Sequence, residues 1–245
     1  GGNNVAGGAL ALDATLIGYQ NTAVGSAALS SVCGNDNVAI GREALVLFTG
    51  SNATAVGKGA AAAATSATFL TAIGKDAAGG LLTGLGNTAV GYNTFMFADG
   101  AEARNTSVGT FAGRFCDGTD DCIAIGFGAL SGVNPSYYGD GATANATKPT
   151  GDKNIAIGSY ALDATTTGSA NVAVGYQAGT ALNTGADNTL IGRAAGVAIT
   201  NGASNIAIGN YALDAANAGE NQNIAIGVNA LGSETSGATG CVAIG

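Results

Sequence analysis

Histidine and tryptophan are absent from this chain of 245 residues, which also has only one methionine and two prolines. Without histidine, the commonest general base and metal ligand is missing, which excludes most familiar hydrolytic and zinc-dependent chemistries. Seven tyrosines and seven phenylalanines are too few to fill a conventional globular core of this length. Something other than bulky side chains must therefore hold the fold together.

Basic residues and long apolar runs are also scarce. Eight lysines and arginines against sixteen acidic residues give a net charge of −8. The chain therefore lacks the basic surface that phosphate neutralisation requires, and no nucleic acid partner is expected. No run approaches the roughly 18 to 20 apolar residues needed to cross a bilayer, so no membrane insertion of this segment is expected.

Glycine, in contrast, is abundant and periodic. Of the 42 glycines, one recurs at intervals of 16 to 18 residues along nearly the whole chain. We call these residues the anchor glycines: Gly8, Gly25, Gly41, Gly57, Gly74, Gly91, Gly109, Gly126, Gly158, Gly175, Gly192, Gly209, Gly227 and Gly245. Such self-similarity is the signature of a repeat architecture.

The residues around each anchor glycine keep a fixed chemistry. The residue three before it is β-branched in every repeat, the residue two before it is almost always Ala, and the residue one before it is almost always Val or Ile. Asn stands four before the anchor at residues Asn4, Asn21, Asn37, Asn87, Asn105, Asn154, Asn171, Asn188, Asn205 and Asn223. A small residue between two β-branched residues predicts a short strand in each repeat.

A repeat of about 17 residues cannot bury its own apolar face, so neighbouring repeats must stack with their strands in register. Helix is disfavoured by the recurring Gly, Asn and β-branched residues. The sequence therefore predicts an all-β fold: residues 1–245 form a single array, a parallel β-solenoid or β-roll with one repeat per rung.

The repeat pattern also suggests roles for its positions. The anchor glycines are expected to turn the chain, and the Asn side chains to hydrogen-bond along a column. We expect the β-branched columns to fill a narrow interior and the Ala column, on the opposite face of the strands, to pack against identical chains. The alternative is a monomeric solenoid whose Ala column faces water.

The repeat is interrupted between Gly126 and Gly158, which are 32 residues apart. Residues 132–150 contain both prolines and show no strand alternation, which favours an inserted loop over a degenerate repeat. Tyrosines on exposed loops are common in contact surfaces. Candidate recognition residues in this loop are Asn134, Tyr137, Tyr138 and Asp140; the alternative is a plain spacer.

A second irregular segment runs from Cys116 to Cys122. The two cysteines flank a glycine turn and can close a small disulfide loop, which would indicate an oxidising environment. Asp117, Asp120 and Asp121 could offer oxygens to Ca²⁺, but their spacing matches no known calcium loop, so a solvated loop is favoured. No other cofactor is expected.

The repeats resemble the head repeats of YadA-type trimeric autotransporter adhesins, and more closely those of phage and other viral tail-fibre proteins. The resemblance is carried by Asn21-Thr22-Ala23-Val24-Gly25, by Asn87-Thr88-Ala89-Val90-Gly91-Tyr92-Asn93 and by Asn171-Val172-Ala173-Val174-Gly175-Tyr176-Gln177-Ala178. It implies a left-handed parallel β-roll that assembles as an intertwined or side-by-side homotrimer. It also implies an extracellular, cell-surface or virion-surface location.

The resulting functional hypothesis is a non-enzymatic fibre or adhesin segment, a rigid rod for attachment to a cell or surface, with a host receptor or glycan as the unidentified partner. One alternative is a free-standing solenoid that binds ice or another flat surface; a Thr column inside the solenoid would argue against it. Another is a carbohydrate-active enzyme on a β-helix, with Asp13, Asp163 and Asp214 at equivalent corners.

Overall fold

The computed structural model describes residues 2–14, 18–98, 100–132, 148–215, 219–232 and 239–245. It confirms the predicted all-β solenoid, with fourteen strands of three residues each, one before every anchor glycine. The chain forms two compact units, Gly1–Gly118 and Thr119–Gly245. The first unit contains β1 (Val5–Gly7), β2 (Thr22–Val24), β3 (Val38–Ile40), β4 (Thr54–Val56), β5 (Thr71–Ile73), β6 (Thr88–Val90) and β7 (Thr106–Val108). The second contains β8 (Ile123–Ile125), β9 (Ile155–Ile157), β10 (Val172–Val174), β11 (Thr189–Ile191), β12 (Ile206–Ile208), β13 (Ile224–Ile226) and β14 (Val242–Ile244).

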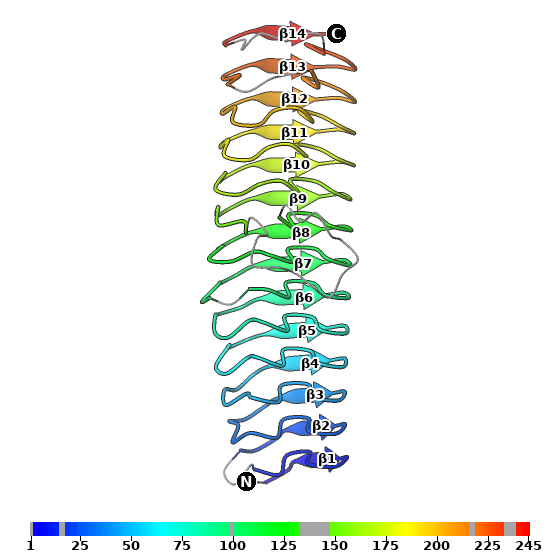
Figure 1. The fold of residues 1–245 in the computed structure, drawn as a ribbon, viewed down its shortest axis with the longest axis vertical. Helices are drawn as coiled ribbons and strands as arrows, with labels where there is room; N and C mark the ends of the chain where they lie inside the picture. The colour runs from blue at the N-terminus through cyan, green and yellow to red at the C-terminus, as the bar shows by residue number, and fades with distance from the viewer. Residues whose placement is uncertain (1, 15–17, 99, 133–147, 216–218, 233–238) are drawn as a thin grey trace. The chain divides into compact units, whose positions relative to one another are not determined.

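Within each unit, every strand pairs in parallel with the next strand along the chain, so the arrows in Figure 1 lie one above another and point the same way. The register matches equivalent repeat positions: Thr54 faces Thr71 between β4 and β5, and Val172 faces Thr189 between β10 and β11. Each turn of the chain therefore adds one strand, which is the arrangement expected when repeats stack rather than fold on their own.

The long interval in the second unit separates two strands that are neighbours in the sheet. β8 pairs directly with β9, with Ile123 opposite Ile155, although the two residues are 32 positions apart. Of the insertion expected at 132–150, residues 133–147, including Asn134, Tyr137, Tyr138 and Asp140, lie outside the described residues.

The anchor glycines sit where successive turns approach closely. Gly25 has a φ of +134°, a conformation that L side chains rarely adopt, and a Cβ there would lie 2.6 Å from the carbonyl carbon of Gly41 in the next turn. Within each unit, the other anchors that are followed by a further turn have the same geometry. Any larger residue would separate the turns, which explains why the repeat always has glycine at this position.

The corners also use left-handed backbone at three further positions per turn, and these are mostly not glycine. Glu43, Leu45 and Asn52, for example, have φ values of 61°, 52° and 59°. The corner backbone nevertheless stays in register, because its amides donate to carbonyls of neighbouring turns, as Glu43 N does to Ser26 O at 2.9 Å and Leu45 N to Ala60 O at 3.0 Å. This continuous ladder stabilises conformations that isolated residues avoid.

The expected orientation of the strand faces is wrong. The Ala column points into the solenoid: Ala23, Ala39 and Ala173 have no exposed surface. The β-branched columns point outward, and Val24 and Ile40 are about two-fifths exposed, at 43% and 39%. The Ala column therefore cannot be the surface that packs against another chain, and it does not face water either.

The reason is the width of the interior. The opposite wall of each turn supplies the bulky groups, among them Leu29, Leu45, Phe48, Leu162 and Leu182, all fully buried. Little more than a methyl group then fits on the strand side. The core of this protein is thus a thin layer of alanines packed against leucines, at the close packing normal for protein interiors.

Candidate functional site

Four features of the solenoid are candidate sites: an internal Asn column, the outer face of the sheet, the corner after each strand and the buried ionisable side chains.

The Asn column lies in the interior. Asn171, Asn188 and Asn205 have at most 1% exposed surface. Asn188 Oδ1 accepts from the backbone N and the Nδ2 of Asn205, both at 3.0 Å. Asn188 Nδ2 donates to Asn171 Oδ1 at 2.9 Å and to Gly202 O at 2.8 Å. These amides cross-link successive turns, so their role is structural.

Two cysteines replace Asn in this column. Cys122 Sγ accepts from Asn154 N at 3.4 Å, and Cys241 N donates to Asn223 Oδ1 at 2.9 Å. Burial raises the pKa of the Cys122 thiol to about 11. Cys116 and Cys122 are both buried, and they belong to different units, so the disulfide expected between them stays a prediction.

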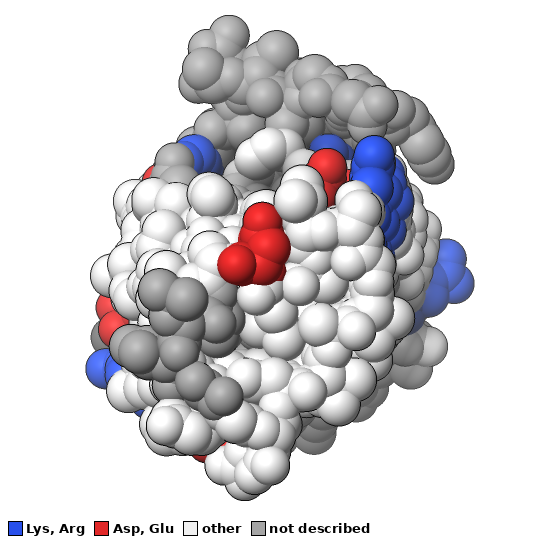
Figure 2. Space-filling view, turned by 90° about the horizontal axis from the view of Figure 1, so that it is seen from below, with Lys and Arg blue, Asp and Glu red and all other residues white. Residues whose placement is uncertain are grey.

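The outer sheet face, defined as the first and third residues of every strand, is the largest regular surface feature of each unit. Every one of these residues is Thr, Val, Ile or, once, Gly, and none is charged. In the second unit the third residue of each strand is Val or Ile throughout, with Ile125 and Ile191 at 37% and 38% exposure. Figure 2 looks at the end of the stack of turns from below, where several charged side chains stand out from a mostly uncharged surface. The outer sheet face is flat, apolar and repetitive.

The corner that follows each strand differs between the two units. In the first unit it carries charges, including Arg42, Glu43, Lys58, Lys75 and Asp76, with an ion pair of 3.1 Å between Lys75 and Asp76. In the second unit it carries rings and one arginine on five successive turns. We call this set the aromatic corner: Phe127, Tyr160, Tyr176, Arg193 and Tyr211.

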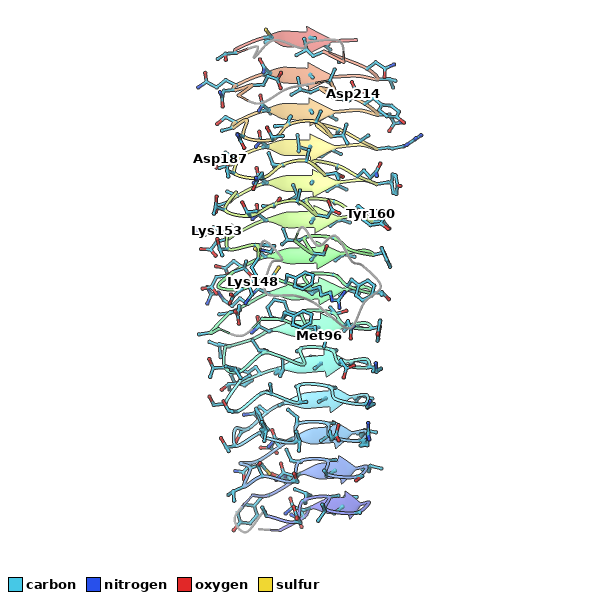
Figure 3. The ribbon with its side chains drawn as sticks, in the orientation of Figure 1. Met96, Lys148, Lys153, Tyr160, Asp187 and Asp214 are labelled. Atoms are coloured by element: carbon cyan, nitrogen blue, oxygen red, sulfur yellow. The ribbon has the colours of Figure 1, made fainter. Side chains whose placement is uncertain are left out.

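The aromatic corner contains two groups of side chains in contact. The ring centroids of Phe127 and Tyr160 are 5.4 Å apart, and those of Tyr160 and Tyr176 are 6.3 Å apart, in both cases edge to face. The Arg193 guanidinium lies 5.0 Å over the Tyr211 ring. In Figure 3, Tyr160 lies at the edge of the sheet where the strand arrows end. From the sequence, Tyr176 and Arg193, which directly follow their anchor glycines, are expected to lie on a solvated rim with no assigned function. Aligning the repeats on these glycines places the rings in two adjacent columns.

The first unit also holds a buried cation. Arg114 is 3% exposed, and its guanidinium lies 4.6 Å from the centroid of Phe111, 5.2 Å from that of Phe115 and 5.4 Å from that of Phe97. Phe97 and Phe115 stack with an interplanar angle of 5°. Three rings around a desolvated arginine form a structural cluster whose cation–π contacts offset part of the cost of burial.

Glu102 is a second buried ionisable group. Its Oε1 accepts from Gly100 N and Gly118 N, both at 3.0 Å, whereas Oε2 is buried without a hydrogen-bond partner. Burial raises the pKa of this carboxyl above its ordinary value of 4.5, although the two backbone amides act in the opposite direction. Glu102 ties two neighbouring turns together at a corner where most turns have glycine.

The aspartates noted in the sequence differ in their surroundings. Asp117 belongs to the first unit, while Asp120 in the second donates its backbone N to Asp152 Oδ1 at 2.8 Å. No group of three or more acidic, His or Cys side chains that could hold a metal ion occurs among the described residues. Asp163 and Asp214 follow strands three turns apart, about 14 Å along the stack, which is longer than the carboxyl separation of glycoside hydrolases.

No protein-family model matches this chain, and no curated protein is significantly similar to it. Within the part of the chain that the structure describes, no helix is both long and apolar enough to span a membrane. We therefore infer the function from the surfaces of the solenoid itself.

Proposed function

We propose that this chain is a structural segment of an extracellular or virion-surface fibre or adhesin, that it acts without catalysis, and that copies associate through the outer sheet face. The resemblance of its repeats suggests three copies around one axis and a left-handed coil. The outer sheet face is the observation that supports the proposal, and it takes the place of the Ala column as the surface of association.

A second copy of the chain is the partner that suits this face best. The seven strands of one unit present an uncharged strip of roughly 300 Å², at about 4.8 Å per strand and about 10 Å per strand length. A strip of this size is comparable to the largest apolar patch of a typical soluble monomer, which is often functional. The strip has the same residue types at every turn, so identical chains lying side by side match it turn by turn.

Lysine substitutions on the outer sheet face test this association. Ile191→Lys places a charge at the centre of the strip in the second unit, and the resulting complex would bury it without a partner. We expect the native mass measured by light scattering to fall toward that of the single chain. The matched control is Gln177→Lys, which adds the same charge at a corner one turn away.

Equal native masses for Ile191→Lys and Gln177→Lys would contradict the assignment of the outer sheet face as the seam. The strand itself is not expected to be disrupted by lysine, because its backbone hydrogen bonds are independent of the side chain and the position faces outward. Circular dichroism of both variants checks that the fold persists.

One observation favours a second candidate function, ice binding. Thr54, Thr71, Thr88 and Thr106 begin the four successive strands β4 to β7, and they lie on the outer sheet face. The Thr column is therefore not internal, and the expectation that would have argued against ice binding is wrong. A flat, regular array of hydroxyl and methyl groups suits an ice surface, and thermal hysteresis of the purified chain is the test.

A further inference from the structure

The corner after each strand is the surface position where composition is least constrained by the fold. Most side chains there are exposed or half-buried, and residues as different as Ala27, Glu43 and Tyr211 take the same left-handed backbone, with φ of 55°, 61° and 57°. The concentration of rings at this position in the second unit is therefore not required by the repeat. It suggests a ligand-contacting surface.

The polar residues of this corner point to the same kind of ligand. In the second unit the two residues after each anchor glycine include Ser159, Gln177, Asn210 and Asn229 beside the rings. Arg193 is the one charged residue among them, and no carboxylate occurs at these positions. Rings interspersed with amides and hydroxyls bind ligands that have both apolar faces and many hydroxyl groups.

Backbone groups of the aromatic corner already hydrogen-bond from turn to turn, which limits how a ligand can bind. Tyr160 N donates to Phe127 O at 3.0 Å, Ala194 N to Tyr176 O at 2.9 Å, and Tyr211 N to Arg193 O at 2.9 Å. These bonds disfavour the addition of an extended peptide as a strand, because strand addition needs a row of unpaired backbone groups. A ligand must instead lie across the exposed ring faces, of which that of Tyr176, a side chain with 47% exposure, is the most accessible.

We propose that the aromatic corner binds an extended, uncharged polysaccharide, whose sugar rings pack on Tyr176 and the neighbouring rings while its hydroxyls hydrogen-bond to the corner amides. One turn of the solenoid rises about 4.8 Å, close to the length of one sugar unit in an extended β-linked chain. The aromatic corner thus contacts several consecutive sugars. This proposal deepens the attachment function proposed above and rests on it, since it names the class of surface polymer that the segment would hold.

Native gel electrophoresis in the presence of soluble polysaccharides tests the proposal, because the acidic chain migrates readily and a bound polymer retards it. The gels contain hydroxyethylcellulose, laminarin or soluble starch, with alginate as an acidic polymer. We expect retardation by at least one of the three neutral polymers. Tyr176→Ala should raise the apparent dissociation constant about three- to tenfold, and Tyr176→Ala/Tyr211→Ala should raise it further.

These substitutions should leave the fold intact, because other turns already have alanine at the same positions: Ala9 matches Tyr176, and Ala27 matches Tyr211 with a φ of 55°. The matched control is Tyr92→Ala, which removes an equivalent ring from the charged corner of the first unit, where Tyr92 lies 5.6 Å from Phe111. Its affinity should be unchanged.

The proposal is overturned if none of the neutral polymers retards the chain, if only alginate does, or if the double variant binds as well as the wild type. Its failure is distinguishable from failure of the fibre proposal. The Ile191→Lys variant tests association independently, so a chain that assembles without binding polysaccharide refutes the aromatic corner alone, and a monomer that binds polysaccharide refutes the assembly alone.

Discussion

Leu190 gives the sharpest test of how the interior is packed. It is the large exception in the Ala column, it is fully buried in β11, and it lies where other turns have a methyl group. Its side chain is accommodated by two glycines on the opposite wall: a Cβ on Gly179 would lie 2.7 Å from Leu190 Cδ1, and one on Gly196 would lie 2.8 Å from Leu190 Cδ2.

We expect Leu190→Ala to destabilise the second unit by about 4 kcal/mol, in the upper half of the range for buried Leu→Ala changes, because the flanking glycines have no side chains that could move into the cavity. Gly179→Ala alone should cost about 1 to 3 kcal/mol by overpacking. In the Leu190→Ala background the contact with Leu190 is gone, and the other close atom, Leu162 Cδ2 at 2.9 Å from the added Cβ, lies at the end of a side chain that can turn into the vacated space. The same methyl should then cost nothing or be slightly stabilising. Alanine is compatible with the backbone, since Ala61 and Ala78 have φ of 51° and 50° at the equivalent position.

The measurement is the opening free energy of the β10 to β12 amides by hydrogen exchange, which resolves local stability in a repeat protein that need not unfold in one step. A double-mutant cycle should give a coupling of at least about 2 kcal/mol between residues 179 and 190. Leu213→Ala, two turns away, is the control and should be additive with Gly179→Ala. Additivity at 179 and 190, within about 0.5 kcal/mol, would refute this account of the core.

Three further predictions concern single residues. Asn188→Ala leaves the backbone amide of Asn205 and the carbonyl of Gly202 without their side-chain partner, so it should lower the free energy of unfolding by about 3 kcal/mol. The control Asn201→Ala, at an exposed site, should change the free energy of unfolding by no more than about 0.5 kcal/mol; urea unfolding measures both. Burial raises the pKa of Glu102, so the protonated carboxyl contributes its full stability below pH 4.5 and loses it as the pH rises through the higher pKa of the folded state. The melting temperature of the wild type should therefore fall relative to that of Glu102→Gln over this pH window. A difference in melting temperature that does not change with pH would contradict this prediction. With a thiol pKa of about 11, Cys122 should react with a thiol reagent at pH 8 only after unfolding, and rapid labelling of Cys122 in the native chain, located by peptide mass spectrometry, would show that the column is open.

Much of the architecture is readable from the sequence because it is set by strong local constraints. Where the turn of Gly25 contacts the turn of Gly41, a backbone φ near +130° and the short distance leave no space for a larger residue. The repeat length of the solenoid is therefore visible in the sequence as a regular spacing of glycines. The Asn column is visible for a similar reason, since each amide must both donate and accept within the turn spacing. The strands follow from the β-branched residues that flank Ala.

The side of the strand that faces inward could not be read in the same way. Alternation separates Ala from Val and Ile, but does not tell which group is internal, and bulky residues are internal in most sheets. Here Leu162 and Leu182 reach across from the other wall and leave space for a methyl group. The two glycines that face Leu190 are the sequence signal of this arrangement, and recognising them requires knowing which turns are adjacent.

The aromatic corner is hard to see for a related reason. Tyr160 and Tyr176 are 16 residues apart in the chain, yet the stacking of turns brings their rings to a centroid distance of 6.3 Å. Residue type also does not predict which corner residues have left-handed backbone, because Glu43, Phe69 and Tyr160 all take that conformation. The neighbouring turns impose it through the backbone ladder.

The mass of the native particle in solution tests the central claim most directly. The chain weighs 23.3 kDa, and an account in which the outer sheet face is covered by identical chains predicts a sedimentation mass of three subunits that persists on dilution. A stable particle of one subunit would contradict it, because the outer sheet face of each unit would then face water, and surface binding by the Thr column would become the leading explanation.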